Sequence, residues 1–166
     1  MEDYGFPDGE FPNVKTLRVH PHFLYDGAKL FKPLVKLFPN VENLAIYIAH
    51  QMFVGNRLVY VEHYDSISLF QKVKDIRTFW PEDYDYEHGS EFLSPWRLEG
   101  IVKGWAKNAR VLEKVVFVRS TPKWRCGGTD TMEAIRVRVE WVGGECETKC
   151  LWSERYKAER LEFDVD

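Results

Sequence analysis

The segment FPNVKTLRV at residues 11–19 returns as FPNVENLAI at residues 38–46, which is 27 positions later. The apolar residues of the two copies fall at matching places, which are Val14, Leu17 and Val19 in the first copy and Val41, Leu44 and Ile46 in the second. The pattern apolar-x-x-apolar-x-apolar is typical of a turn that leads into a short strand, because residues two positions apart point to the same side of a strand. The sequence therefore predicts a short strand at the end of each copy.

Two looser copies follow, FQKVKDIRT at residues 70–78 and ARVLEKVVF at residues 109–117. The third copy places Thr78 where the first two have an aliphatic residue, and the fourth lacks the Phe-Pro-Asn sequence. Tandem units of about this length with this apolar spacing are typical of leucine-rich repeats, in which each unit adds one strand to a parallel sheet and a helix or irregular segment to the outer layer. An ordinary α/β domain in which the repeated Phe-Pro-Asn-Val is a coincidence is the alternative.

The phrases FPNVKTLRV, LFPNVENLAIY and ARVLEKVVFV resemble the degenerate leucine-rich repeats that follow the F-box in fungal and plant F-box proteins. The resemblance covers residues 11–120. It implies a eukaryotic protein that recognises a substrate for a ubiquitin ligase and catalyses no reaction itself. No F-box helix with a Leu-Pro-x-Glu sequence precedes the repeats, so no site for the Skp adaptor is expected and only substrate recognition is implied.

The composition indicates one folded domain over residues 1–166. Hydrophobic residues make up 45% of the chain and aromatic residues 15%, which excludes a disordered tail or a collagen-like repeat. No apolar run approaches the roughly 20 residues of a membrane span, so we expect a cytoplasmic or nuclear protein with no membrane contact. With 23 Lys and Arg against 26 Asp and Glu, the formal net charge is −3, which gives no reason to expect nucleic acid.

The segment after Ser94 is the clearest predicted helix. Ser94 suits the N-cap and Pro95 the first helical position. The apolar residues that follow have helical spacing and are Leu98, Ile101, Val102, Trp105 and Ala109. Gly100 and Gly104 share a face, for which we expect a close approach to the sheet. An earlier segment that starts near Asp26 has Leu30, Leu34 and Leu37 on one face, but Pro33 is expected to kink or shorten a helix there.

Residues 131–166 change to an alternating pattern. Apolar and charged residues alternate from Ile135 to Trp141, and Gly143-Gly144 suits a tight hairpin turn. This register predicts that Val137 faces Cys150 and that Trp141 faces Cys146. We expect this hairpin, with a last strand at residues 161–165, to cap the repeats. The predicted fold is thus a short, irregular, leucine-rich-repeat-like α/β solenoid with a mainly parallel sheet, closed by a C-terminal antiparallel hairpin.

Catalytic and metal-binding motifs are missing from the sequence. It contains no phosphate-binding loop, dinucleotide-binding glycine motif, His-Glu-x-x-His or Gly-x-Ser-x-Gly. On one strand Cys146 and Cys150 would lie about 13 Å apart, beyond the reach of a disulfide, so we expect buried free thiols. We predict no catalytic residue, cofactor or metal. A small α/β enzyme or ligand-binding domain with scattered site residues is the alternative function.

The predicted site is a protein-binding surface on the concave face of the stacked strands. Residues that flank the inward-pointing pair of each strand would form this face, and its mix of arginine and aromatic residues suits protein recognition. The expected anchors are Arg18, His20, Tyr47, Arg77 and Phe79. A second patch is expected in WPEDYDYEH at residues 80–88, where Trp80, Tyr84 and Tyr86 alternate with acids that would favour a basic partner. A solvated insertion is the alternative for this second patch.

Overall fold

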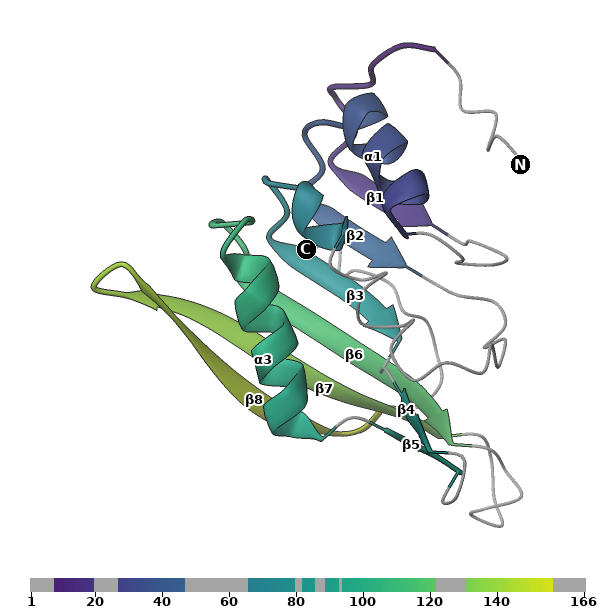
Figure 1. Cartoon of the computed structure of the whole chain (residues 1–166), viewed down its shortest axis with the longest axis vertical. Helices are drawn as coiled ribbons and strands as arrows, with labels where there is room; N and C mark the ends of the chain where they lie inside the picture. Colours follow the sequence, from purple (N-terminus) through teal and green to yellow (C-terminus); the bar gives the residue numbers. More distant parts are fainter. Residues whose placement is uncertain are drawn as a thin grey trace.

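The four repeated segments become neighbouring strands of one sheet (Figure 1). The computed structural model describes residues 8–19, 27–46, 66–79, 82–85, 89–92, 94–121 and 131–156. The elements in chain order are β1 (Thr16–Val19), α1 (Gly27–Leu37), β2 (Asn43–Ile46), the 3-10 helix η1 (Ser66–Leu69), β3 (Asp75–Phe79), β4 (Glu82–Asp85), β5 (Gly89–Phe92), α3 (Pro95–Ala106), β6 (Lys114–Thr121), β7 (Thr131–Val142) and β8 (Glu145–Tyr156).

The main sheet has the order β1-β2-β3-β6-β7-β8, and β4 and β5 form a separate antiparallel pair. The pairs β1-β2, β2-β3 and β3-β6 are parallel, as the repeats predict. Their register aligns the repeats position by position, which places in one row Leu17, Leu44, Ile76 and Val115. The pairs β6-β7 and β7-β8 are antiparallel, so the sheet as a whole is mixed.

The turn before each repeat strand recurs as well. The backbone N–H of Val14 donates to the carbonyl of Phe11 at 3.2 Å, and Val73 and Leu112 make the equivalent bonds in the third and fourth copies. The ring of Phe11 also stacks on that of Phe38, the same position of the next copy, at 5.5 Å between centroids. Equivalent residues of successive copies therefore contact each other.

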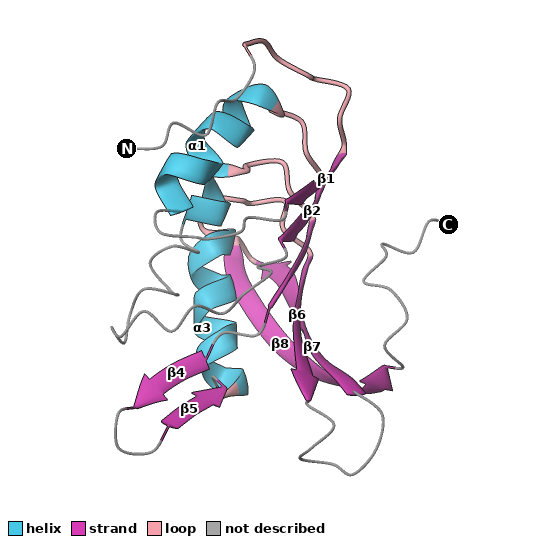
Figure 2. Ribbon diagram, turned by 90° about the vertical axis from the view of Figure 1, so that its right-hand side faces the viewer, coloured by secondary structure: helices cyan, strands magenta, loops and turns pink. Residues whose placement is uncertain are grey.

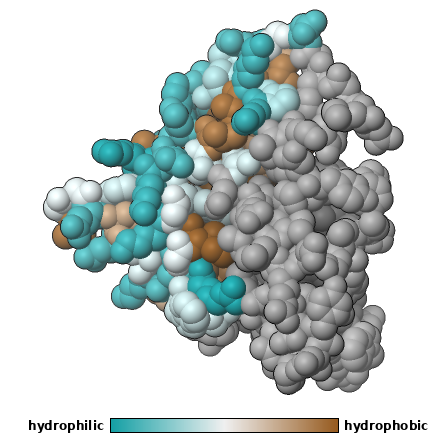
Figure 3. All heavy atoms as spheres, in the orientation of Figure 1, coloured by the Kyte–Doolittle hydropathy of each residue, from teal (hydrophilic) through white to brown (hydrophobic). Residues whose placement is uncertain are grey.

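One face of the sheet carries all the described helices (Figure 2). The apolar residues of the strands pack there against Phe31 and Leu34 of α1, Ile67 of η1 and Trp105 of α3. Helix α1 continues through Pro33 to Leu37, so the proline does not end it. The burial of its apolar side offsets the roughly 3 kcal/mol that a proline costs inside a helix. Seen from this side, exposed apolar side chains are scattered among polar ones (Figure 3).

The predicted close approach of Gly100 and Gly104 to the sheet is wrong. Both glycines are exposed, and no described atom outside their own helix lies within 4 Å of the position where a Cβ would stand. Helix α3 instead turns Leu98, Val102 and Trp105 to the core. Gly100 is two residues from both Leu98 and Val102, which places it about 200° around the helix from each, on the solvent side. No helix in the described ranges is both long and apolar enough to cross a membrane.

The hairpin has the predicted register but not the predicted role. Val137 pairs with Cys150 and Trp141 with Cys146, and Gly143 and Gly144 take φ angles of 60° and 88°, as a tight hairpin turn requires. The prediction that this hairpin closes the fold is wrong: β7 pairs with β6 in the plane of the sheet, so the hairpin lengthens an open sheet. The predicted strand at residues 161–165 lies outside the described residues.

Candidate partner-binding face

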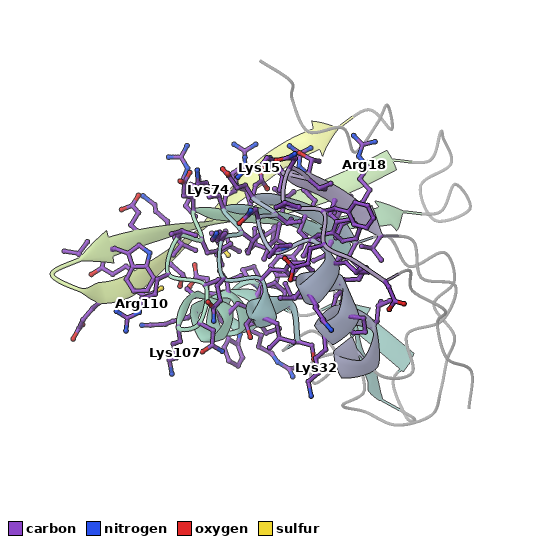
Figure 4. All side chains as sticks on the ribbon, turned by 90° about the horizontal axis from the view of Figure 1, so that it is seen from above. Lys15, Arg18, Lys32, Lys74, Lys107 and Arg110 are labelled. Atoms are coloured by element: carbon purple, nitrogen blue, oxygen red, sulfur yellow. The ribbon has the colours of Figure 1, made fainter. Side chains whose placement is uncertain are left out.

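The side of the main sheet that carries none of the described helices holds many charged side chains, and we call it the helix-free face. It also holds apolar residues, which are Ala45, Val116, Val118, Ala134 and Leu151. Alternate residues of each strand point to it, and the strand register arranges them in rows, two of which cross all six strands. The first row runs Thr16, Asn43, Asp75, Lys114, Arg138 and Lys149. The second row runs Arg18, Ala45, Arg77, Val116, Arg136 and Leu151. Figure 4 shows Arg18 on this side and Lys32 and Lys107 on the side of the helices.

Two of the predicted anchors are placed by the structure on this face. Arg18 is exposed on β1 and Arg77 is half-buried on β3, and both stand in the second row. Phe79 ends β3 and pairs with Val118, but its side chain is outside the described part of the chain. His20 and Tyr47 lie outside the described residues.

The predicted second patch is described only in part. Tyr84 belongs to β4, where its backbone pairs with Ser90 of β5. Its side chain, Trp80 and Tyr86 lie outside the described residues. The structure therefore places the backbone of residues 82–85 in a separate two-stranded ribbon and does not test the grouping of these three aromatic rings.

In the repeat half of the first row most polar side chains pair with one another, although Asp75 Oδ1 is buried without a hydrogen-bond partner. The side-chain amide of Asn43 donates to Thr16 Oγ1 at 3.3 Å. Lys114 Nζ lies 2.7 Å from Asp75 Oδ2, and the Asp75 side chain is largely shielded from solvent. These contacts join β1 to β2 and β3 to β6. They leave little charge in this part of the row for another molecule.

Glu42, in the turn before β2, joins three repeats. Its carboxylate lies 2.9 Å from Lys15 Nζ of the first copy and 2.9 Å from Lys74 Nζ of the third. The hydrogen bond from Lys74, with that from Lys15, lowers the pKa of Glu42 to about 2. The same contact raises the pKa of Lys74. The residue before each repeat strand alternates in charge along the sheet, in the order Lys15, Glu42, Lys74 and Glu113.

The hairpin half of the face carries cations that, unlike Lys114, have no side-chain partner among the described residues. Sequence reasoning missed them. Arg136 and Arg138 of β7 and Lys149 of β8 make no hydrogen bond or ion pair through their side chains within the described part of the chain, and the same holds for Arg18. Arg138 stands directly opposite Lys149, and Arg136 buries its Nε without an acceptor. The signal for this cluster was present, because both arginines alternate with inward valines and the predicted register placed Lys149 beside them.

The cysteines on the helix side do not form a reactive site. Cys150 N donates to Glu99 Oε1 at 2.8 Å, and its Sγ lies 3.5 Å from the carbonyl of Pro95. Burial, with the nearby Glu99, raises the pKa of the Cys150 thiol to about 12, which disfavours the nucleophilic thiolate. Cys146 and Cys150 are free thiols, as predicted, but they are half-buried and not fully buried. The described residues contain no group of His, Cys, Asp and Glu side chains that could hold a metal ion.

Comparisons with protein-family models, with curated proteins and with solved structures find no match for this chain. The functional argument therefore depends on the surface itself. The described part of that surface offers arginine and lysine side chains beside short apolar ones on a sheet face.

Proposed function

We propose that this chain is a non-catalytic protein-recognition module, built as a short leucine-rich-repeat-like solenoid, which binds its partner on the helix-free face. The observation that carries the proposal is the register of the parallel strands, which sets equivalent positions of the four copies side by side. The repeated turn and the stacking of Phe11 on Phe38 support the solenoid. In a solenoid, such rows present an extended binding surface.

The side chains of the face suit a protein partner. Arginine is enriched at the energetic centres of protein interfaces, and Arg18, Arg77 and Arg136 all stand in the second row. Val116 and Leu151 are half-buried in the same row and add apolar area. The resemblance to F-box proteins supports a more specific role, in which the bound partner is a substrate for a ubiquitin ligase.

Lysine-directed crosslinking of the tagged protein with the proteins that co-purify tests which face binds. Lys114 and Lys149 stand on the helix-free face, whereas Lys32 and Lys107 are exposed on the helix side. We expect crosslinks from the partner to the first pair. Arg18→Glu should reduce recovery of that partner, and the matched helix-side reversal Lys107→Glu should not. Crosslinks confined to the helix side would overturn the proposal.

The ligase role has its own readout. Loss of the gene should raise the steady-state level of the partner, because its degradation would slow. An unchanged level, with binding at the helix-free face intact, would remove the ligase role and leave the recognition module.

A further inference from the structure

Two pairs of like charges face each other across β7 and β8. Arg138 is directly opposite Lys149, and Glu140 is directly opposite Glu147. Like charges in these positions destabilise an antiparallel pair, whereas opposite charges stabilise it. Exchanging the residues at positions 147 and 149 would produce two attractive pairs with the same composition. The folding of the hairpin therefore does not explain the arrangement.

The three cations at this end of the face form a single cluster, which we call the β7-β8 cation cluster: Arg136, Arg138 and Lys149. Arg136 lies two residues before Arg138 and points to the same face. The buried Nε of Arg136 has no acceptor, and no side chain in the described residues pairs with any member of the cluster. A carboxylate is the complementary group, since it accepts hydrogen bonds from guanidinium and ammonium donors.

The second row extends this charge across the sheet. Arg18, Arg77 and Arg136 are each separated from the next by one strand, which contributes the small or apolar Ala45 or Val116. Two strand spacings correspond to about 9.6 Å. An extended chain that crosses the strands would meet a cation at regular intervals, with the half-buried Val116 between Arg77 and Arg136.

We propose that the helix-free face binds an acidic segment of a partner protein, with the β7-β8 cation cluster as its main anchor; this rests on the proposed function. A protein segment fits better than a nucleic acid. Glu140 and Glu147 border the cluster on the same face and would repel a phosphodiester backbone that continued along the hairpin.

Two charge reversals in β8 make matched variants. Lys149→Glu places a carboxylate opposite Arg138, and Glu147→Lys places an ammonium opposite Glu140, so each removes one like-charge pair. Both should melt at or slightly above the temperature of the native protein. They should differ in binding, because only Lys149→Glu removes an anchor. If Lys149→Glu folds poorly, Lys149→Gln takes its place.

The probe is a fluorescein-labelled synthetic peptide that alternates glutamate with alanine, followed by fluorescence polarisation. We expect binding that weakens between about 50 and 300 mM NaCl. Lys149→Glu should weaken it about tenfold or more, and Glu147→Lys should leave it equal or tighter. A peptide with lysine in place of glutamate should not bind, and single-stranded poly(U) should not compete.

Three results would overturn the inference: no binding of the acidic peptide, equal binding by Lys149→Glu and the native protein, or effective competition by poly(U). Crosslinking of the natural partner distinguishes this failure from failure of the proposed function. If the peptide fails while the partner still crosslinks to Lys114 or Lys149, the face binds a protein of different chemistry. If crosslinks fall only on the helix side, the proposed function itself fails.

Discussion

Glu42, in the turn before β2, accepts hydrogen bonds from lysines of both neighbouring copies, whereas Glu140 in the hairpin stands opposite another glutamate. In the repeats, the charged side chains join one copy to the next. In the hairpin, the apolar side and the glycine turn hold the strands, and the charges on the other side add repulsion. The charged side chains thus stabilise the contacts between strands in the repeats, whereas in the hairpin they oppose them.

This comparison gives expectations about stability that differ between the halves. Substitutions in the core of the repeats should destabilise the whole sheet. Substitutions at the tip of the hairpin should act locally, and substitutions of charge should act in opposite directions in the two halves. The variants below test these expectations from the largest effect to the smallest.

Leu44→Ala should have the largest effect. Leu44 lies on β2 between β1 and β3, and its side chain is 0% exposed. Removing a fully buried leucine side chain costs about 2–5 kcal/mol in free energy of unfolding, because apolar contacts are lost and a cavity remains. Urea denaturation followed by circular dichroism measures the change.

Val142→Ala is the control in the hairpin half. Val142 is 55% exposed at the end of β7, so its truncation should change the free energy of unfolding by less than about 0.5 kcal/mol. A loss comparable to that of Leu44→Ala would mean that the tip of the hairpin contributes to the stability of the whole sheet and does not act locally.

Gly144→Ala should weaken the hairpin alone. Gly144 has a φ of 88°, a conformation that costs an alanine about 1–2 kcal/mol. We expect faster hydrogen exchange at the β7-β8 tip and unchanged exchange in β2 and β3. Gly143→Asn serves as the control, because asparagine tolerates positive φ and φ at Gly143 is 60°. Faster exchange throughout the sheet would contradict local action.

Thr78→Val should stabilise the repeats. Thr78 points inward between Ile46 and Phe117, and its hydroxyl is buried without a hydrogen-bond partner in the described structure. Valine has nearly the same shape and removes the unsatisfied group, so the free energy of unfolding should rise by about 1 kcal/mol. Thermal melting measures the gain. A lower melting temperature would show that the hydroxyl has an acceptor.

The sequence predicted the repeat strands, their parallel register and the hairpin register, because all three follow from local patterns. An apolar residue at every second position, together with a glycine pair, determines which strand residues share a face. The position of Arg18 and Arg77 in one row follows from the same periodicity.

Whether the hairpin extends the sheet or covers its end could not be predicted in the same way. Both an added pair of strands and a cap would bury Ile135 and Val137, so the pattern alone does not distinguish them. The prediction that Gly100 and Gly104 approach the sheet failed for a related reason. Their spacing shows that they share a face of the helix, but it does not show whether that face contacts the sheet or solvent. The cation cluster needed the register of β7 and β8 before its three members could be recognised as neighbours.

Glu42→Gln should have a small effect with a clear pH dependence. The pKa of Glu42 falls from 4.5 to about 2 in the folded chain, because Lys74 and Lys15 stabilise its carboxylate. A lowered folded pKa contributes stability that is present above pH 4.5 and is lost as the pH falls towards 2. The variant should therefore melt below the native protein at neutral pH, and the difference should shrink through that window. Melting temperatures of both proteins across this range measure the effect.

Glu140→Gln completes the comparison, because Glu140 faces Glu147 rather than a lysine. Its neutralisation removes a repulsion, so the melting temperature at neutral pH should stay equal or rise slightly, opposite in sign to Glu42→Gln. If both variants lowered the melting temperature equally at neutral pH, the two glutamates would have the same role, and the contrast between the repeats and the hairpin would be wrong. Opposite signs would show that the carboxylates of the repeats stabilise the fold and that those of the hairpin do not.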